Sequence, residues 1–176
     1  TDSQILRLLD SFPEGETGNK WSFGFQCMAV YGLRPEDLRY IHTRNGGQEM
    51  WTNYEKSKGG KKGEKTEPRR LYPLLVHDIE GPISWHLKEQ LYLCEQEGRN
   101  LLPNLGKAGE AGDRCKNYLA RRQSWGAIKE EVAREKRWEK ALRKDAFKQH
   151  EFTPNAYFPA NSKVPDHVQV PILKRM

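Results

Sequence analysis

The sequence predicts a mainly α-helical α+β fold, with helices around a small three-stranded antiparallel sheet. Apolar residues recur at helical spacing over the first 31 residues and again after residue 82. Between these regions, two segments rich in β-forming residues flank Asn45-Gly46-Gly47, a strong hairpin signal. The length of 176 residues suits one domain, which we expect over residues 1–150, followed by an irregular tail over residues 151–176.

The first two helices are predicted from caps and apolar spacing. Asp2 and Ser3 are suitable N-caps for a short helix that extends to about residue 12. The Pro, Gly and Asn content of residues 13–19 predicts a loop. A second helix is expected over residues 21–31, and Gly32 is well placed to end it.

The pattern then changes from helix to strand. A proline opens a short helix over residues 35–38. Residues 39–43 and 49–54 are rich in β formers and read as the two strands of the hairpin. Residues 55–67 are almost all Lys, Gly and Glu, which predicts an extended loop. Residues 71–76 read as a third strand, and their proline places it at a sheet edge.

The second half of the chain predicts helices. A helix is expected over residues 82–97, with Gly98 at its end. Residues 100–112 form a connection that contains Gly and Pro. Residues 113–150 are helical in character, with a break near residues 124–126.

The positive charge is concentrated in two blocks. The net charge is +6; residues 54–70 hold 7 basic and 3 acidic groups (+4), and residues 107–148 hold 13 and 7 (+6). Between them, residues 71–106 hold 2 basic and 5 acidic groups (−3). Clustered basic charge is typical of proteins that bind a polyanion such as nucleic acid. The alternative is a solvated loop and a solvated helix face.

Other classes of function are disfavoured. Cys27, Cys94 and Cys115 are odd in number and have no CxxC spacing, which argues against a disulfide scaffold and a zinc site. Residues 1–12 do not resemble a signal peptide, and no run approaches the ~20 apolar residues of a membrane span, so we expect a cytoplasmic protein without a membrane partner. A phosphate-cradling Gly-x-x-x-x-Gly-Lys-Ser/Thr loop is absent, and no metal or other cofactor is implied.

Two motifs are suited to phosphate chemistry. In Gly32-Leu33-Arg34-Pro35-Glu36-Asp37-Leu38, Arg34 offers a rigid fork of donors, and Asp37 is spaced to orient it. An ordinary surface ion pair is the alternative for these two residues. The Lys-rich loop can follow a phosphate backbone or deliver a proton to a leaving oxygen. Its lysines are Lys56, Lys58, Lys61, Lys62 and Lys65.

Together these motifs resemble the catalytic domain of tyrosine recombinases, the phage-integrase family, over roughly residues 3–150. The amino-acid sequences of residues 29–35 and 57–60 are most similar to those of cyanobacterial integrases. In that family a Gly-Leu-Arg-x-x-Glu/Asp-Leu motif carries the first catalytic arginine, which implies this role for Arg34. A lysine in the turn between the second and third strands acts as the general acid. This implies Lys58, with Lys56, Lys61 and Lys62 as close competitors.

The resemblance implies DNA strand exchange through a covalent phosphotyrosine, in which arginines clamp the scissile phosphate. Double-stranded DNA is the implied partner. Other recombinase protomers are a second candidate partner, and the alternative is that the protein is a monomer. The remaining implied DNA contacts are Lys56, Lys61, Lys62, Lys65, Arg69, Arg121 and Arg122.

Part of the family pattern is missing. None of the five histidines is followed three residues later by Arg, so the His-x-x-Arg box is absent. Tyr157 lies where that box should begin, and Pro159 would interrupt a helix there. We therefore expect a truncated, catalytically incomplete recombinase. The alternatives are a noncatalytic nucleic-acid-binding module that uses residues 54–70 and 107–148, and a helical adaptor whose charges only solvate it.

Overall fold

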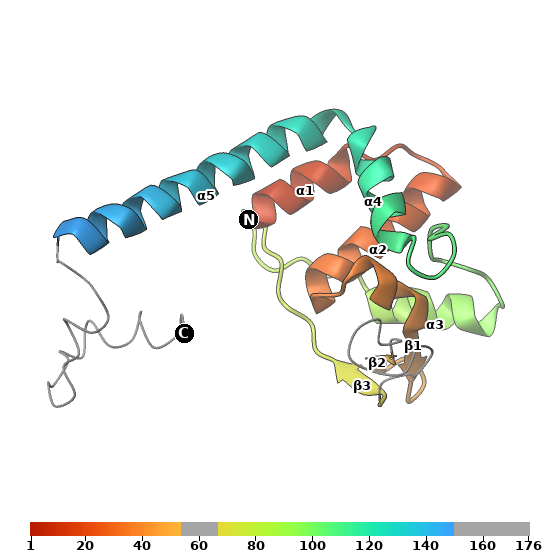
Figure 1. Cartoon of the computed structure of the whole chain (residues 1–176). Helices are drawn as coiled ribbons and strands as arrows, with labels where there is room; N and C mark the ends of the chain where they lie inside the picture. The colour runs from red at the N-terminus through yellow and green to blue at the C-terminus, as the bar shows by residue number, and fades with distance from the viewer. Residues whose placement is uncertain (54–66, 150–176) are drawn as a thin grey trace, which may run out of the picture. The chain divides into compact units, whose positions relative to one another are not determined.

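The computed structural model describes residues 1–53 and 67–149 and is mainly α-helical, with one small three-stranded antiparallel sheet (Figure 1). This confirms the predicted fold class. Residues Thr1–Ile128 form one compact unit and a second begins at Lys129. Nearly all of the expected Lys-rich loop and the whole of the expected tail over residues 151–176 lie outside the described residues.

The first two helices begin earlier than predicted. Helix α1 (Asp2–Asp10) has Thr1 as its N-cap, not Asp2 or Ser3. Helix α2 (Glu16–Tyr31) begins at Glu16, not at residue 21, so the predicted loop over residues 13–19 was too long. Lys20 bonds Glu16 one turn earlier at 2.6 Å, a pairing that supports the added turn. Helix α2 ends at Gly32 as predicted, with φ at 62°, a left-handed conformation that glycine adopts at little cost.

Two glycines of α2 allow other segments to approach closely. A Cβ atom on Gly18 would lie 1.7 Å from the Pro13 carbonyl oxygen. A Cβ atom on Gly24 would lie 3.3 Å from the Pro103 ring. The segments on either side of α2 therefore pack directly against its backbone.

The sheet follows a 3₁₀ helix, η1 (Pro35–Tyr40). Strands β1 (Ile41–Arg44) and β2 (Glu49–Thr52) form the predicted hairpin, and β3 (Arg69–Leu71) pairs with β2 at the sheet edge. The third strand ends at Leu71 and does not extend to residue 76 as predicted, because Pro73 has no N–H for a ladder. Instead, the Leu74 N–H donates to the Val30 carbonyl of α2 at 2.6 Å.

Three helices complete the described chain: α3 (Leu87–Gln96), α4 (Ala111–Ala120) and α5 (Gln123–Gln149). Helix α3 begins later than the predicted residue 82, because the Ile83 N–H donates to the Val76 carbonyl at 2.8 Å in an extended segment. The predicted break near residues 124–126 lies instead at residues 121–122, between α4 and α5.

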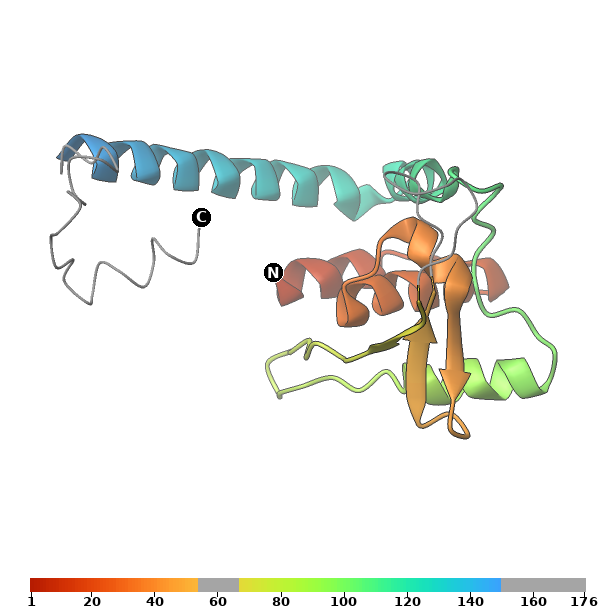
Figure 2. The same ribbon diagram turned by 60° about the horizontal axis from the view of Figure 1, so that its bottom comes forward.

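The core of the first unit lies where α2, η1, the sheet and α3 meet, and Figure 2 shows α3 beside the hairpin. The Glu95 carboxylate of α3 accepts the Thr43 N–H of β1 at 3.1 Å, which ties helix to sheet. The three cysteines are buried and free. No helix within residues 1–53 and 67–149 combines the length and the apolar character needed to span a membrane. Among the core residues, Phe23, Cys27, Leu38 and Met50 are almost completely buried.

Candidate nucleic-acid interface

The Arg34–Asp37 pair presents an exposed guanidinium on a fixed backbone. The Arg34 side chain is 71% exposed, whereas the Asp37 side chain is 4% exposed. Asp37 Oδ2 accepts the Arg34 N–H at 3.0 Å and lies 3.7 Å from Arg34 Nε. The carboxylate therefore holds the first turn of η1 by a hydrogen bond and forms an ion pair with the Arg34 side chain, most of which is exposed. A phosphate can reach this group.

Arg39, which directly follows this motif, has a structural role. Its Nε donates to Glu36 Oε1 at 2.7 Å. Its terminal nitrogens donate to the carbonyl oxygens of Gly106 at 2.9 Å, Leu105 at 2.6 Å and Lys107 at 2.7 Å. These bonds use most of the guanidinium's five N–H groups. Arg39 therefore fastens the loop ahead of α4 to η1.

Glu36 extends this connection to the start of α4. Its Oε1 accepts the Gly109 N–H at 3.0 Å, and its Oε2 accepts the Ala111 N–H at 3.3 Å. A carboxylate near the first N–H groups of a helix is favourable, because those donors have no partner within the helix. The pair Glu36–Arg39 thus positions α4 relative to η1.

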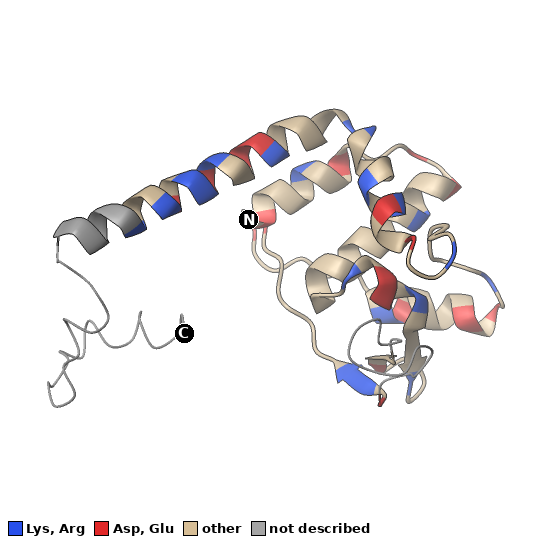
Figure 3. Ribbon diagram, in the orientation of Figure 1, with Lys and Arg blue, Asp and Glu red and all other residues tan. Residues whose placement is uncertain are grey.

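A basic groove of about 930 Å³ lies among α2, η1, α4 and the loop before α4. Its cationic lining residues are Lys20, Arg39, Arg114, Arg121 and Arg122. Among the described residues, no carboxylate belongs to the lining. Figure 3 shows basic residues on α4, with acidic residues beside them on the same helix. We call this surface the α4 groove.

The cations of the α4 groove differ in how far they are neutralised. Lys20 Nζ lies 2.6 Å from the Glu16 carboxylate. Arg114 lies 3.7 Å from Glu110, a distance too long for a hydrogen bond. Within the part of the chain that the structure describes, no carboxylate pairs with the Arg121 guanidinium. Positive charge that can attract an anion is therefore concentrated toward the C-terminal end of α4.

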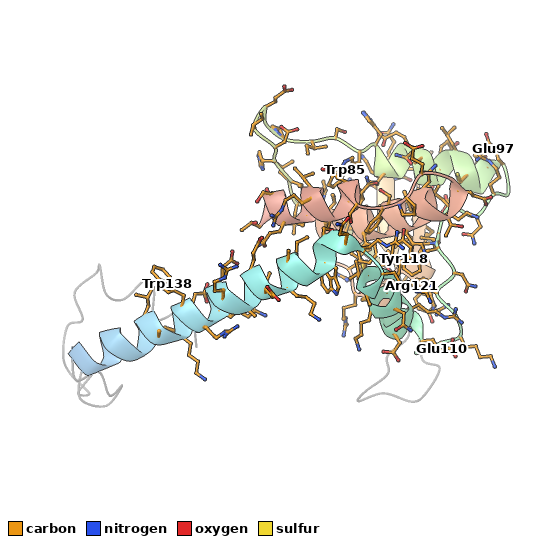
Figure 4. The ribbon with its side chains drawn as sticks, turned by 90° about the horizontal axis from the view of Figure 1, so that it is seen from above. Trp85, Glu97, Glu110, Tyr118, Arg121 and Trp138 are labelled. Atoms are coloured by element: carbon orange, nitrogen blue, oxygen red, sulfur yellow. The ribbon has the colours of Figure 1, made fainter. Side chains whose placement is uncertain are left out.

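A stack of three side chains forms one wall of the groove. The Trp21 and Tyr118 rings are stacked at 4.4 Å with an interplanar angle of 15°. The Arg122 guanidinium carbon also lies over the Tyr118 ring, 4.6 Å from its centroid. Burial raises the pKa of the Tyr118 hydroxyl, and the nearby Arg122 charge opposes this shift. Figure 4 shows Tyr118 on α4 and Arg121 at the C-terminal end of this helix.

The structure groups only part of the predicted site. Arg121 and Arg122 line the α4 groove, but Arg34 does not belong to its lining. Arg69 is exposed on β3. Figure 3 draws this strand in blue, because two of its residues are Arg69 and Arg70. Arg70 is ion-paired with Glu49 at 2.8 Å. The five predicted loop residues, Lys56, Lys58, Lys61, Lys62 and Lys65, lie outside the described residues.

Sequence reasoning missed Lys20, Arg39 and Arg114 as groove residues. A signal for α4 was present, because Arg114, Tyr118, Arg121 and Arg122 follow the i, i+4, i+7, i+8 spacing of one helix face. Lys20 carried no such signal, since its place in the groove depends on the approach of α4 to α2.

No family model, curated protein or solved structure matches this chain.

Proposed function

We propose that this chain is a double-stranded DNA-binding protein of the tyrosine recombinase type, which acts in DNA integration or recombination and is catalytically incomplete by itself. The observation that carries the proposal is the exposed Arg34 guanidinium, held by buried Asp37 directly ahead of an antiparallel hairpin. The segment that follows the hairpin holds five lysines and leads into a third strand. This order of elements agrees with what the recombinase resemblance implies.

In this proposal, Arg34 neutralises charge on the scissile phosphate. A fixed donor aimed at a phosphate is worth most when negative charge increases toward a phosphorane-like state. Asp37 acts as a positioning residue, because it accepts the Arg34 backbone N–H and forms an ion pair with the Arg34 side chain. Lys58 is the proposed acid for the leaving oxygen.

The covalent step needs residues that this sequence lacks. Without a His-x-x-Arg box, the second arginine of the phosphate clamp is missing. We therefore expect the chain alone to form no covalent adduct with a suicide DNA substrate, as measured by denaturing gel electrophoresis. An adduct that disappears in the Tyr157→Phe variant would show that the chain is a complete recombinase.

A second candidate function is noncatalytic nucleic-acid binding through the basic segments 54–70 and 107–148. The α4 groove favours it, because Arg114, Arg121 and Arg122 come from the second segment. The two candidates differ in how much they depend on Arg34. A recombinase-like site needs the phosphate contact of Arg34. A protein that binds nucleic acid through many scattered basic residues scarcely depends on one arginine.

The deciding experiment measures binding of the full chain to a labelled DNA duplex by fluorescence anisotropy, over about 50 to 200 mM salt. Arg34→Gln should weaken binding and lower the slope of log K against log salt by roughly 1. Arg99→Gln is the matched control, because Arg99 is also exposed (65%) and paired with a carboxylate, that of Glu97, but lies in the acidic stretch. Equal binding of wild type and Arg34→Gln would refute the recombinase-like site, and salt-independent binding would refute both candidates.

A further inference from the structure

We propose that the α4 groove binds the phosphodiester backbone of a nucleic-acid strand through Arg114 of α4 and through Arg121 and Arg122 directly after it, without stacking on or reading the bases. This inference takes its ligand class from the proposed DNA binding, but it does not depend on Arg34. It assigns a second phosphate-binding surface to the Thr1–Ile128 unit, defined by Arg114, Arg121 and Arg122.

The donors come from α4 and from the short connection that follows it. Arg114 and Tyr118 lie one turn apart on α4, Arg121 and Arg122 directly follow its last residue, and all four line the groove. Residue 117, an asparagine of α4, lines the groove as well. A guanidinium presents a planar fork that matches two phosphate oxygens, so three arginines in one groove suit neighbouring phosphates better than a single small anion.

The arginine donors are not consumed within the protein. Arg114 is beyond hydrogen-bond distance of Glu110, at 3.7 Å. Arg122 Nε is buried and has no hydrogen-bond partner among the described residues. A buried cationic donor without an acceptor is costly, so an anion in the groove would recover part of that cost. Arg39 differs, because Glu36 and three carbonyl groups already occupy it.

Two asparagines of the loop before α4 add neutral donors. Asn100 Oδ1 accepts the Leu102 N–H at 2.9 Å, and Asn104 Oδ1 accepts the Gly106 N–H at 3.0 Å. Each bond fixes the side-chain oxygen toward the loop backbone, which leaves the amide NH₂ group as a donor. Both residues line the groove. Amide donors of this kind commonly contact phosphate and sugar oxygens.

The aromatic residues of the groove are not a platform for bases. Trp21 stacks on the Tyr118 ring, and the Arg122 guanidinium also lies over this ring. The Trp21 side chain itself is only 8% exposed. Proteins that hold unpaired bases need free aromatic faces, so this groove recognises the charged backbone. An acidic peptide is the competing occupant, but the two basic blocks of the chain favour a long polyanion with regularly spaced charges.

The test compares two exposed cations, one that lines the groove and one on α4 that does not. Arg121→Gln removes a groove cation, whereas Lys116→Gln removes an exposed α4 cation that pairs with Asp113 and is not part of the lining. Arg121→Gln should lower the salt slope of duplex binding by about 0.9, and Arg114→Gln/Arg121→Gln by about 1.8. Lys116→Gln should leave the slope unchanged. These variants keep Arg122 on Tyr118, and circular dichroism checks that each is folded.

Three further ligands define the class of partner. The loss caused by Arg121→Gln should be equal for an oligothymidine and for an abasic strand of the same length, because only the backbone is bound. Pyrophosphate and polyglutamate should compete far more weakly than DNA at equal charge concentration. A larger loss with oligothymidine would show base contact and overturn the inference. Displacement by pyrophosphate or polyglutamate as strong as that by DNA would assign the groove to free phosphates or acidic peptides.

The results separate this inference from the recombinase-like site. If Arg121→Gln and Lys116→Gln have equal effects while Arg34→Gln weakens binding, the groove is not a phosphate site and the Arg34 site stands. If only the groove variants weaken binding, the groove stands and the Arg34 site fails. If no variant changes the binding of DNA, both proposals are wrong.

Discussion

Arg39→Lys should destabilise the protein far more than Arg34→Lys, although Arg34 caps η1 and Arg39 lies within the same short helix. Arg39 donates four hydrogen bonds, one to Glu36 and three to carbonyl groups of residues 105–107. Arg34 is 71% exposed, and its guanidinium Nε lies 3.7 Å from Asp37. A lysine keeps the charge at either position but replaces a planar fork with a single nitrogen.

The expected magnitude follows from these bonds. One ammonium nitrogen cannot reach four acceptors that surround a guanidinium, so at least two bonds are lost. A hydrogen bond to a charged group contributes about 1.5–3 kcal/mol, and we take the lower end because the Arg39 side chain is 21% exposed. The free energy of unfolding should therefore fall by about 3 kcal/mol. At roughly 4 °C for each kcal/mol, Tm should fall by roughly 12 °C.

Urea denaturation monitored by tryptophan fluorescence measures the difference. Arg34→Lys should change the free energy of unfolding by less than about 0.5 kcal/mol, as expected for an exposed pair. Hydrogen exchange should also increase at residues 105–111 in Arg39→Lys, because that loop loses its attachment to η1. A loss below about 1 kcal/mol, or equal losses in the two variants, would refute the structural role of Arg39.

Two further predictions concern packing and pH. Gly18→Ala should lower Tm although alanine favours helices, because its Cβ would lie 1.7 Å from the Pro13 carbonyl oxygen and overpacking costs about 1–3 kcal/mol. Gly126→Ala should raise Tm instead, because a Cβ atom at this helical position has nothing within 4 Å. A rise of Tm in both variants would contradict the close approach of the Pro13 carbonyl oxygen to Gly18. Burial raises the pKa of Tyr31 to about 12, so its contribution to stability is complete below pH about 10 and is lost as pH rises toward 12. Tyr31→Phe should flatten this alkaline loss of unfolding free energy, whereas Tyr72→Phe, at an exposed residue, should not; identical pH profiles would contradict the assignment.

The elements that sequence patterns predicted well depend on local chemistry. Gly32 ends α2 and the turn at Asn45-Gly46-Gly47 connects β1 to β2, because positive φ angles favour Gly and Asn wherever the rest of the chain lies. The start of α3 was predicted too early, because Pro82 suits a helix start but the segment around Ile83 pairs with Val76 instead. That pairing joins residues of two extended segments and leaves no periodic signal.

The predicted Arg34–Asp37 pair shows why a motif predicts only part of a site. Its spacing of three residues within a helical turn fixes the local geometry, so the sequence contains most of the information. Glu36 and Arg39 have the same spacing and also form an ion pair, at 2.7 Å, yet their partners lie more than 60 residues away in sequence. Spacing alone could not separate an arginine that faces solvent from one that fastens a loop. Burial separates them, and it makes the testable distinction that replacing Arg39 changes stability whereas replacing Arg34 changes binding.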